Sequence, residues 1–125
     1  MITVKGYRYY TDSNQPSFSE KYENLGQWMC DIQNNAYSKD KIYLPARNED
    51  GSFNQTFSKT PSGCLRYYGN DNIEYKLIEM IIDEYGEVLF SSGSRTNGKG
   101  HISSKMKEIL NGFDEWIKRD YVLAE

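Results

Sequence analysis

The sequence IEYKLIEMIIDEYGEVLFSSG, residues 73–93, decides the fold class. Two runs rich in β-branched and aromatic residues flank the segment DEYGE, whose composition is typical of a chain reversal. In an extended first run, the apolar residues would occupy both faces, with Ile73, Tyr75, Leu77 and Ile81 on one and Ile78, Met80 and Ile82 on the other. The stretch therefore predicts a β-hairpin that is partly covered on both sides.

Two helical patterns lie on either side of this hairpin in the sequence. From residue 17 to residue 36, apolar residues recur at spacings of three and four, and Ser17 precedes Glu20 by three positions, as in a capping box. A second such stripe runs from residue 102 to residue 117, with Ser103 or Ser104 as its cap. Trp28 lies beside the first stripe and Trp116 on the second, so we expect both rings in the core.

The remaining strand signals are shorter. Residues 2–11 alternate as a strand does, and KIYL, SFNQTF and CLRYY are candidate short strands. The predicted order is β-α-β-β-β-β-α. It indicates an α+β fold, in which an antiparallel sheet carries two amphipathic helices packed mainly on one face. At 125 residues the chain has the length of one domain, residues 1–125.

Residues 93–99 contain the frame GxxxxGK of a phosphate-binding loop. Such a loop needs a Ser or Thr hydroxyl directly after the lysine to hold Mg²⁺, and a parallel acidic strand nearby. Here Gly100 follows Lys99, and the acidic run ending at Asp83 belongs to the predicted hairpin. We therefore expect neither nucleotide binding nor nucleotide hydrolysis at this frame.

Charges of opposite sign cluster in neighbouring segments. We name as the acidic hairpin Asp71, Glu74, Glu79, Asp83, Glu84 and Glu87, and as the basic loop Arg95, Lys99, His101, Lys105 and Lys107. The acidic hairpin could meet a basic surface of a partner, or serve only to prevent strand pairing at the sheet edge. The basic loop could hold a phosphate backbone, or be an ordinary solvated connection.

Eleven tyrosines are more than a small core can hide with every hydroxyl bonded, so several should reach the surface. The candidate contacts are Tyr9, Tyr10, Tyr67, Tyr68 and Tyr85. Each of these rings could also be an ordinary strand residue on a half-exposed sheet.

Catalytic and metal-binding patterns are not apparent in the sequence. His101 is the only histidine, and Cys30 and Cys64 stand 34 residues apart without a CxxC motif. We expect both thiols to be reduced and partly buried. No nucleophile motif, cofactor motif or set of zinc ligands is recognisable, so we expect a non-enzymatic protein without metal or cofactor. No stretch has the length and apolar character of a membrane span or a secretion signal, and we expect a cytoplasmic protein with no membrane contact.

In size, in its richness in tyrosine and asparagine, and in its α+β layout, the chain resembles small acidic accessory proteins of phages and mobile elements of low-GC bacteria, a group that includes anti-CRISPR proteins. The resemblance implies a stoichiometric inhibitor in the cytoplasm of a bacterial host, occupying a nucleic-acid-binding surface of a host protein. The net charge of -3 favours such a protein-binding module. The alternative is a small nucleic-acid-binding protein that uses the basic loop and exposed tyrosines.

Overall fold

The computed structural model of the chain describes residues 1–9, 16–54, 65–69, 71–92 and 100–123. Within them the elements follow the order β1 (Ile2–Tyr9), β2 (Ser17–Tyr22), α1 (Leu25–Asn35), a single 3₁₀ turn (Lys39–Lys41), β3 (Ile42–Tyr43), β4 (Arg66–Tyr68), β5 (Tyr75–Asp83), β6 (Val88–Ser91), β7 (His101–Ile102) and α2 (Ser104–Leu123).

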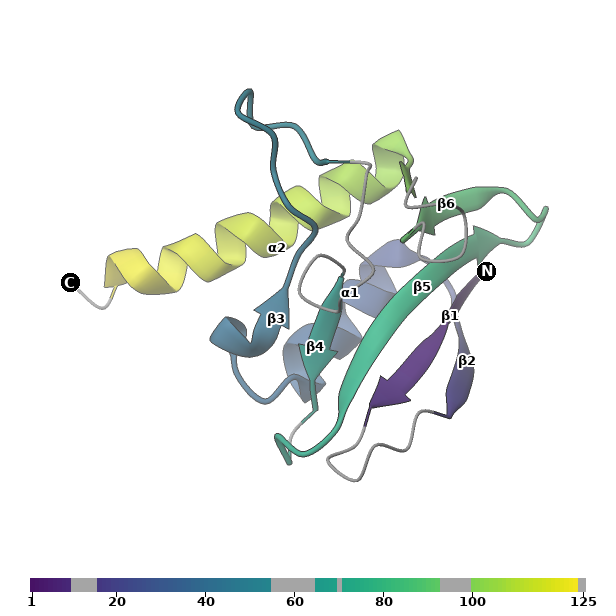
Figure 1. Ribbon diagram of the computed structural model, residues 1–125, viewed down its shortest axis with the longest axis horizontal. Coiled ribbons are helices and arrows are strands. Elements are labelled where there is room, and N and C mark those ends of the chain that lie inside the picture. The colour runs from purple at the N-terminus through teal and green to yellow at the C-terminus, as the bar shows by residue number, and fades with distance from the viewer. Residues whose placement is uncertain (10–15, 55–64, 70, 93–99, 124–125) are drawn as a thin grey trace.

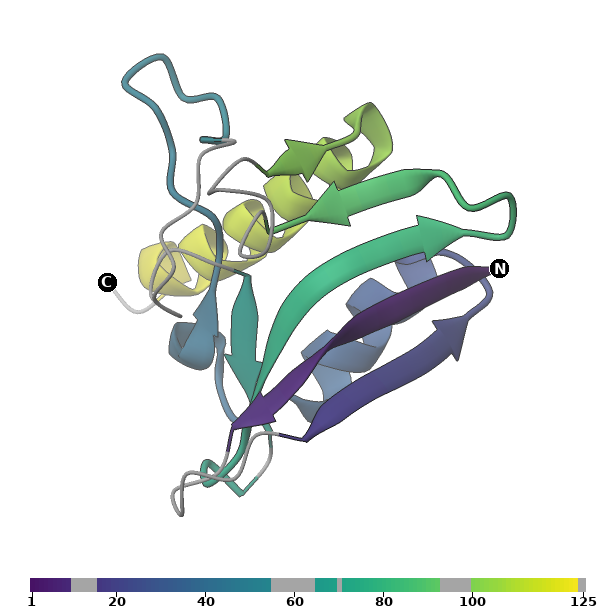
Figure 2. The ribbon, with the colours of Figure 1, turned by 45° about the vertical axis from the view of Figure 1, so that its right-hand side comes forward.

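The strands of these residues form one antiparallel sheet around β5. Its order is β2-β1-β5-β4-β3, and β6 also pairs with β5 and in turn with β7. Strand β1 follows β5 along one edge, while β4 and β6 pair with the two ends of its other edge. Both helices lie on the same side of the sheet (Figure 1, Figure 2). The predicted α+β class, antiparallel sheet and helix arrangement are confirmed.

The core lies between the sheet and the two helices. The Asn24 side chain caps α1 by accepting a hydrogen bond of 2.8 Å from the Gln27 N–H, and Trp28 is fully buried one turn into the helix. From α2, Phe113 meets Trp28 edge to face, with ring centroids 6.0 Å apart. Trp116 is only half-buried, at the margin of the core. The expectation of a core tryptophan is thus confirmed for Trp28 and holds in part for Trp116.

The first predicted helix is too long at its beginning. Ser17–Tyr22 is the edge strand β2, paired antiparallel with β1, and the helix begins only at Leu25. Phe18 and Tyr22 are four residues apart, a spacing that places them on one face of a strand as well as of a helix. Pairing with β1 satisfies the backbone groups along one side of this segment, and Asn24 rather than Ser17 is the cap.

A β-bulge in β5 changes the predicted faces of the hairpin. Lys5 of β1 stands opposite Met80 and Gly6 opposite Ile78, so Glu79 has no opposite residue. The extra residue shifts the alternation by one position. Ile78 and Ile81 are consequently both fully buried, although strict alternation assigns them to opposite faces.

Two of the three short strands predicted between the first helix and the hairpin are present. KIYL contains β3 and CLRYY contains β4. Of SFNQTF, only the beginning is described, and Phe53 there forms an isolated bridge with Arg47 rather than a strand. This bridge closes the narrow loop that projects from the upper part of the molecule in Figure 1.

The phosphate-loop frame itself lies outside the described residues, but both of its flanks are described. Strands β6 and β7, which precede and follow it, pair antiparallel, and β6 is antiparallel to β5. After Gly100 the chain enters β7, and α2 begins only at Ser104. A nucleotide-binding P-loop leads from a strand directly into a helix of a parallel sheet, so these flanks have a different architecture.

Candidate functional site

The turn between β5 and β6 presents the most exposed large hydrophobic side chain among the described residues. Tyr85 is 87% exposed at its tip. Oδ1 of Asp83 accepts hydrogen bonds of 2.9 Å from the backbone N–H groups of Tyr85 and Glu87, and Gly86 adopts a positive φ of 81°. These contacts hold the turn in one conformation. We name residues 83–87 the hairpin tip.

A groove of about 380 Å³ lies beside the hairpin tip, between it and the first turns of both helices. Its charged side chains are Glu23, Asp83, Glu84, Glu108 and Lys105. Four of these five are acidic, and the Met1 ammonium, 3.9 Å from Glu84, adds a second positive charge, so the groove and the tip together still present net negative charge. Lys105 belongs to the basic loop, and the structure therefore brings one member of that loop next to the acidic hairpin.

The six residues of the acidic hairpin do not form one patch. Asp71 and Glu74 precede β5, whereas Asp83 is its last residue and Glu84 and Glu87 follow it. Nine residues of extended chain separate the two groups by about 27 Å. Glu79 lies between them at the bulge, where burial raises the pKa of its carboxyl. The acidic residues of the hairpin tip, Asp83, Glu84 and Glu87, can therefore contact one small surface together, but not together with Asp71 and Glu74.

The basic loop is described only in its second half. His101 in β7, and Lys105 and Lys107 in the first turn of α2, are exposed. Arg95 and Lys99 lie outside the described residues. The Ser103 hydroxyl accepts a hydrogen bond of 3.2 Å from the Met106 N–H, which is the capping interaction predicted for this helix.

A row of tyrosines crosses the face of the sheet opposite the helices. Tyr9 stacks on Tyr75 with centroids 4.8 Å apart and planes 1° from parallel, Tyr75 lies 5.1 Å from Tyr68, and Tyr68 lies 6.2 Å from Tyr43. We name these four residues, from β1, β5, β4 and β3, the tyrosine row. Each ring is half-buried.

Cationic side chains cover parts of the tyrosine row. The Arg66 guanidinium lies 4.3 Å from the Tyr43 ring centroid and 5.3 Å from that of Tyr75, and the Lys41 ammonium lies 5.4 Å from that of Tyr68. Burial is the largest cause that raises the pKa of Tyr75, and the neighbouring Tyr9 raises it further. The rings are thus packed against one another and against cations.

The structure corrects the expectation that Tyr67 and Tyr68 are both surface contacts. Successive residues of a strand point to opposite faces, so Tyr68 joins the tyrosine row while Tyr67 points toward α1. Tyr67 is only 5% exposed. Tyr9 and Tyr85 are accessible, and Tyr10 lies outside the described residues.

On the helix side of the sheet, a polar network connects strands β1, β2 and β5. Glu20 of β2 contacts the Lys76 ammonium at 2.6 Å, an Arg8 guanidinium nitrogen at 3.2 Å and the Tyr22 hydroxyl at 2.8 Å. Burial alone raises the pKa of Glu20, but the hydrogen bonds from Lys76 and Tyr22 and the charge of Lys76 outweigh it. The pKa of Glu20 therefore lies below its ordinary value. Burial and contact with Glu20 raise the pKa of Tyr22.

Sequence reasoning missed this network. The capping-box pattern places Glu20 at the start of a helix, and no pattern in the sequence singles out Lys76. The alternation in SFSEKY is the signal that could have placed Glu20 and Tyr22 on one face of a strand.

Among the described residues, no three His, Cys, Asp or Glu side chains are grouped so that they could hold a metal ion. Cys30 carries an exposed free thiol, so the prediction that it is partly buried is wrong, and Cys64 lies outside the described residues. Within the described part of the chain, neither helix has the combination of length and apolar sequence that spanning a membrane requires.

No protein-family model matches the chain, no curated protein matches it, and no solved structure matches it.

Proposed function

We propose that this protein is a non-enzymatic binding module for a protein partner, and that the hairpin tip is the centre of its contact surface. The observation that carries the proposal is the Tyr85 ring, 87% exposed on a turn that Asp83 holds in place. A rigid, exposed tyrosine loses little conformational entropy on binding and is a common energetic centre of protein interfaces.

The charge around Tyr85 supports a partner with a basic contact surface. Glu84 and Glu87 are exposed in the same turn as Tyr85, and the adjoining groove carries four acidic side chains and one basic one. A surface of this kind is complementary to a basic protein surface and accelerates association with it at low ionic strength. The partner's contact surface is therefore basic.

A basic surface that binds nucleic acid is the partner that fits this charge best, because its natural ligand is also polyanionic. The protein would then act as a stoichiometric inhibitor that occupies that surface. This is the mode of action implied by the resemblance to accessory proteins of phages and mobile elements, including anti-CRISPR proteins, and the place of action is the cytoplasm of a bacterial host.

A second candidate is a small nucleic-acid-binding protein, and the tyrosine row favours it. Tyrosines across the sheet face that neither helix covers can stack on unpaired bases, and Arg66 and Lys41 lie among them. However, Tyr75 is already stacked on Tyr9, and the Arg66 guanidinium lies over Tyr43. Base stacking would have to displace these contacts, so protein binding remains the first proposal.

The experiment is an affinity capture from a lysate of a low-GC bacterium, with and without nuclease. Wild-type protein is compared with a Tyr85→Ala, Glu84→Lys, Glu87→Lys variant and with a matched control, Tyr37→Ala with Glu49→Lys, whose changes lie away from the tip. We expect the wild type and the control to capture one protein in stoichiometric amounts, with or without nuclease. The tip variant should not capture this protein. Nuclease-sensitive capture supports the second candidate, and capture that all three proteins share contradicts the assignment to the tip.

A further inference from the structure

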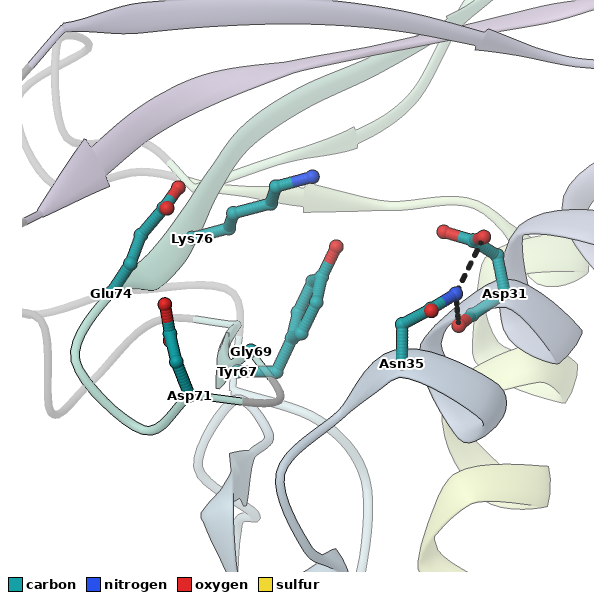
Figure 3. A pocket seen from close by; sticks show the side chains of 7 residues that line it. All are labelled: Asp31, Asn35, Tyr67, Gly69, Asp71, Glu74 and Lys76. Carbon is teal, nitrogen blue, oxygen red and sulfur yellow. Dashed lines mark hydrogen bonds between the residues drawn. The ribbon is translucent and has the colours of Figure 1, made fainter.

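A pocket of about 450 Å³ lies at the other end of β5, between the helix side of the sheet and the last turns of α1. Figure 3 shows its lining, with Asp31 and Asn35 from α1, Tyr67 from β4, Lys76 from β5, and Asp71 and Glu74 from the connection between these strands. An isolated bridge between Ala36 and Gly69 joins the end of α1 to the end of β4 and fixes this side of the pocket.

The Tyr67 hydroxyl is directed into this pocket. The Tyr67 residue is 5% exposed, and no described residue forms a hydrogen bond with its hydroxyl. In Figure 3 the hydroxyl lies between Lys76 and the Asp31–Asn35 pair. The hydroxyl oxygen is not among the buried atoms without a partner, so it keeps access to the pocket, where a ligand can hydrogen-bond to it in place of water.

The charge of the pocket identifies the ligand's chemistry. Lys76 pairs with Glu20 at 2.6 Å and Arg8 pairs with Glu74 at 3.4 Å, so these four charges balance. The negative charges of Asp31 and Asp71 remain without a counter-charge, because neither carboxylate has a basic side chain within ion-pair distance in the described part of the chain.

Both remaining carboxylates are held in place by neutral donors. Asp31 accepts hydrogen bonds from the Tyr22 hydroxyl at 3.0 Å and from the Asn35 amide at 3.0 Å, and Asp71 accepts one from the Ile73 N–H at 3.1 Å. Such bonds fix the direction of a carboxylate without neutralising its charge. Burial and the charges of Glu20 and Asp31 raise the pKa of Tyr67, as expected for a hydroxyl in a negative potential.

We propose that this pocket binds an organic cation, namely the guanidinium or primary ammonium group at the end of an alkyl chain. The cation would donate hydrogen bonds to Asp31 and the Tyr67 hydroxyl, while Asp71, on the other side of the pocket in Figure 3, would attract it by charge and the alkyl chain would lie along the Tyr67 ring. The volume is in the range of small-ligand sites. The source of the cation is an arginine or lysine side chain of another protein, or a free small amine. The inference does not depend on the hairpin tip, which lies at the opposite end of β5.

The test is a titration of the full chain followed by backbone amide NMR. The probes are agmatine, spermidine and N-acetyl-arginine methylamide, with N-acetyl-citrulline methylamide as a neutral probe of the same shape. We expect saturable shifts at the amides of Asn35, Gly69 and Lys76 with the cations only. Tighter binding of the arginine derivative than of the free amines indicates a protein side chain as the source, and the reverse order indicates a small amine.

The variants test the pocket directly. Asp31→Asn removes the charge of the carboxylate that the cation contacts, and it should weaken binding of the cations about tenfold or more. Asp71→Asn keeps the oxygen that accepts the Ile73 N–H but removes the charge, and it should weaken binding several-fold, as should Tyr67→Phe. Glu49→Gln, a charge removal on an exposed loop, should leave the affinity unchanged. Equal shifts with the citrulline probe, or unchanged affinity in folded Asp71→Asn and Tyr67→Phe proteins, would overturn the proposal.

Discussion

The Cα of Gly6 lies so close to the carbonyl oxygen of Leu77 that a Cβ on Gly6 would be far inside van der Waals contact with it. This approach occurs at the bulge, where Gly6 of β1 stands opposite Ile78 and the register shifts. The obstacle is backbone rather than a movable side chain. The pairing of β1 with β5 in the observed register therefore depends on the absence of a side chain at this position.

We predict that Gly6→Ala lowers the free energy of unfolding by about 3 kcal/mol or more, because β1 and β5 must separate or change register. Urea denaturation measures the loss. Gly112→Ala is the matched control, since its new methyl group meets only the flexible end of Met29 and α2 gains helix propensity. Its stability should stay within about 1 kcal/mol of wild type. Similar losses in both variants would contradict the assigned register.

The pH dependence of stability should reveal the network around Glu20. Its pKa is lower in the folded protein than the ordinary value of 4.5, so the carboxylate stabilises the fold above that value. This stabilisation is lost as the pH falls through the folded pKa. We predict that Glu20→Gln lowers stability at neutral pH and flattens its fall in acid, as measured by urea denaturation at several pH values.

Glu79 provides the contrasting case, because burial raises its pKa. Its ionised form costs stability at neutral pH, and this cost disappears as the pH falls through the folded pKa. Glu79→Gln should therefore raise stability at neutral pH and leave it unchanged in acid.

For Glu20, the contrary result would be a Glu20→Gln variant whose stability falls in acid as steeply as that of wild type. Its ion pairs would then contribute nothing measurable to stability.

The two tryptophans should differ in their importance for stability. Trp28 is fully buried against Phe113, and we predict that Trp28→Ala costs about 3–5 kcal/mol, enough to unfold a marginal domain. Trp116 is half-buried, with the Lys39 ammonium 4.3 Å from its ring centroid, so Trp116→Ala should cost clearly less. Thermal denaturation followed by circular dichroism compares them, and an equal loss in both would place Trp116 in the core after all.

The hairpin tip should depend on the Asp83 side chain as an acceptor rather than as a charge. Asp83→Ala removes both hydrogen bonds to the turn and should cost about 1 kcal/mol, whereas Asp83→Asn keeps an acceptor oxygen and should cost less. Hydrogen exchange at the Tyr85 and Glu87 amides reports on the turn. Unchanged exchange in Asp83→Ala would mean that the turn holds its shape without this side chain.

The fold class could be predicted from the sequence because two strand-forming runs flank the reversal DEYGE in residues 73–93 and because the second helix repeats a clear helical period. The first helix could not be delimited, since Phe18 and Tyr22 fit a strand as well as a helix. The bulge at Glu79 could not be predicted either, because it arises from the close approach of β1 to β5 and no pattern in the sequence around Glu79 indicates it. Both errors arise where pairing between strands overrides the local pattern.

The candidate sites were less predictable than the fold. The alternation in CLRYY could have shown that Tyr67 and Tyr68 point to opposite faces. In contrast, the pocket around Tyr67 is built from α1, β4, β5 and the connection between the last two strands. No motif brings these segments together in the sequence, so only the tertiary structure shows that Asp31 and Asp71 line one pocket.

The central claim is that the hairpin tip carries binding to a basic protein. The most direct measurement is the affinity and association rate of the purified partner for wild type, for Tyr85→Ala and for Glu84→Lys with Glu87→Lys, at several salt concentrations. We predict that Tyr85→Ala weakens binding by 2 kcal/mol or more, about thirtyfold. We further predict that the charge reversals slow association, most strongly at low salt. Wild-type affinity and association rate in both variants, with the fold intact, would contradict the claim.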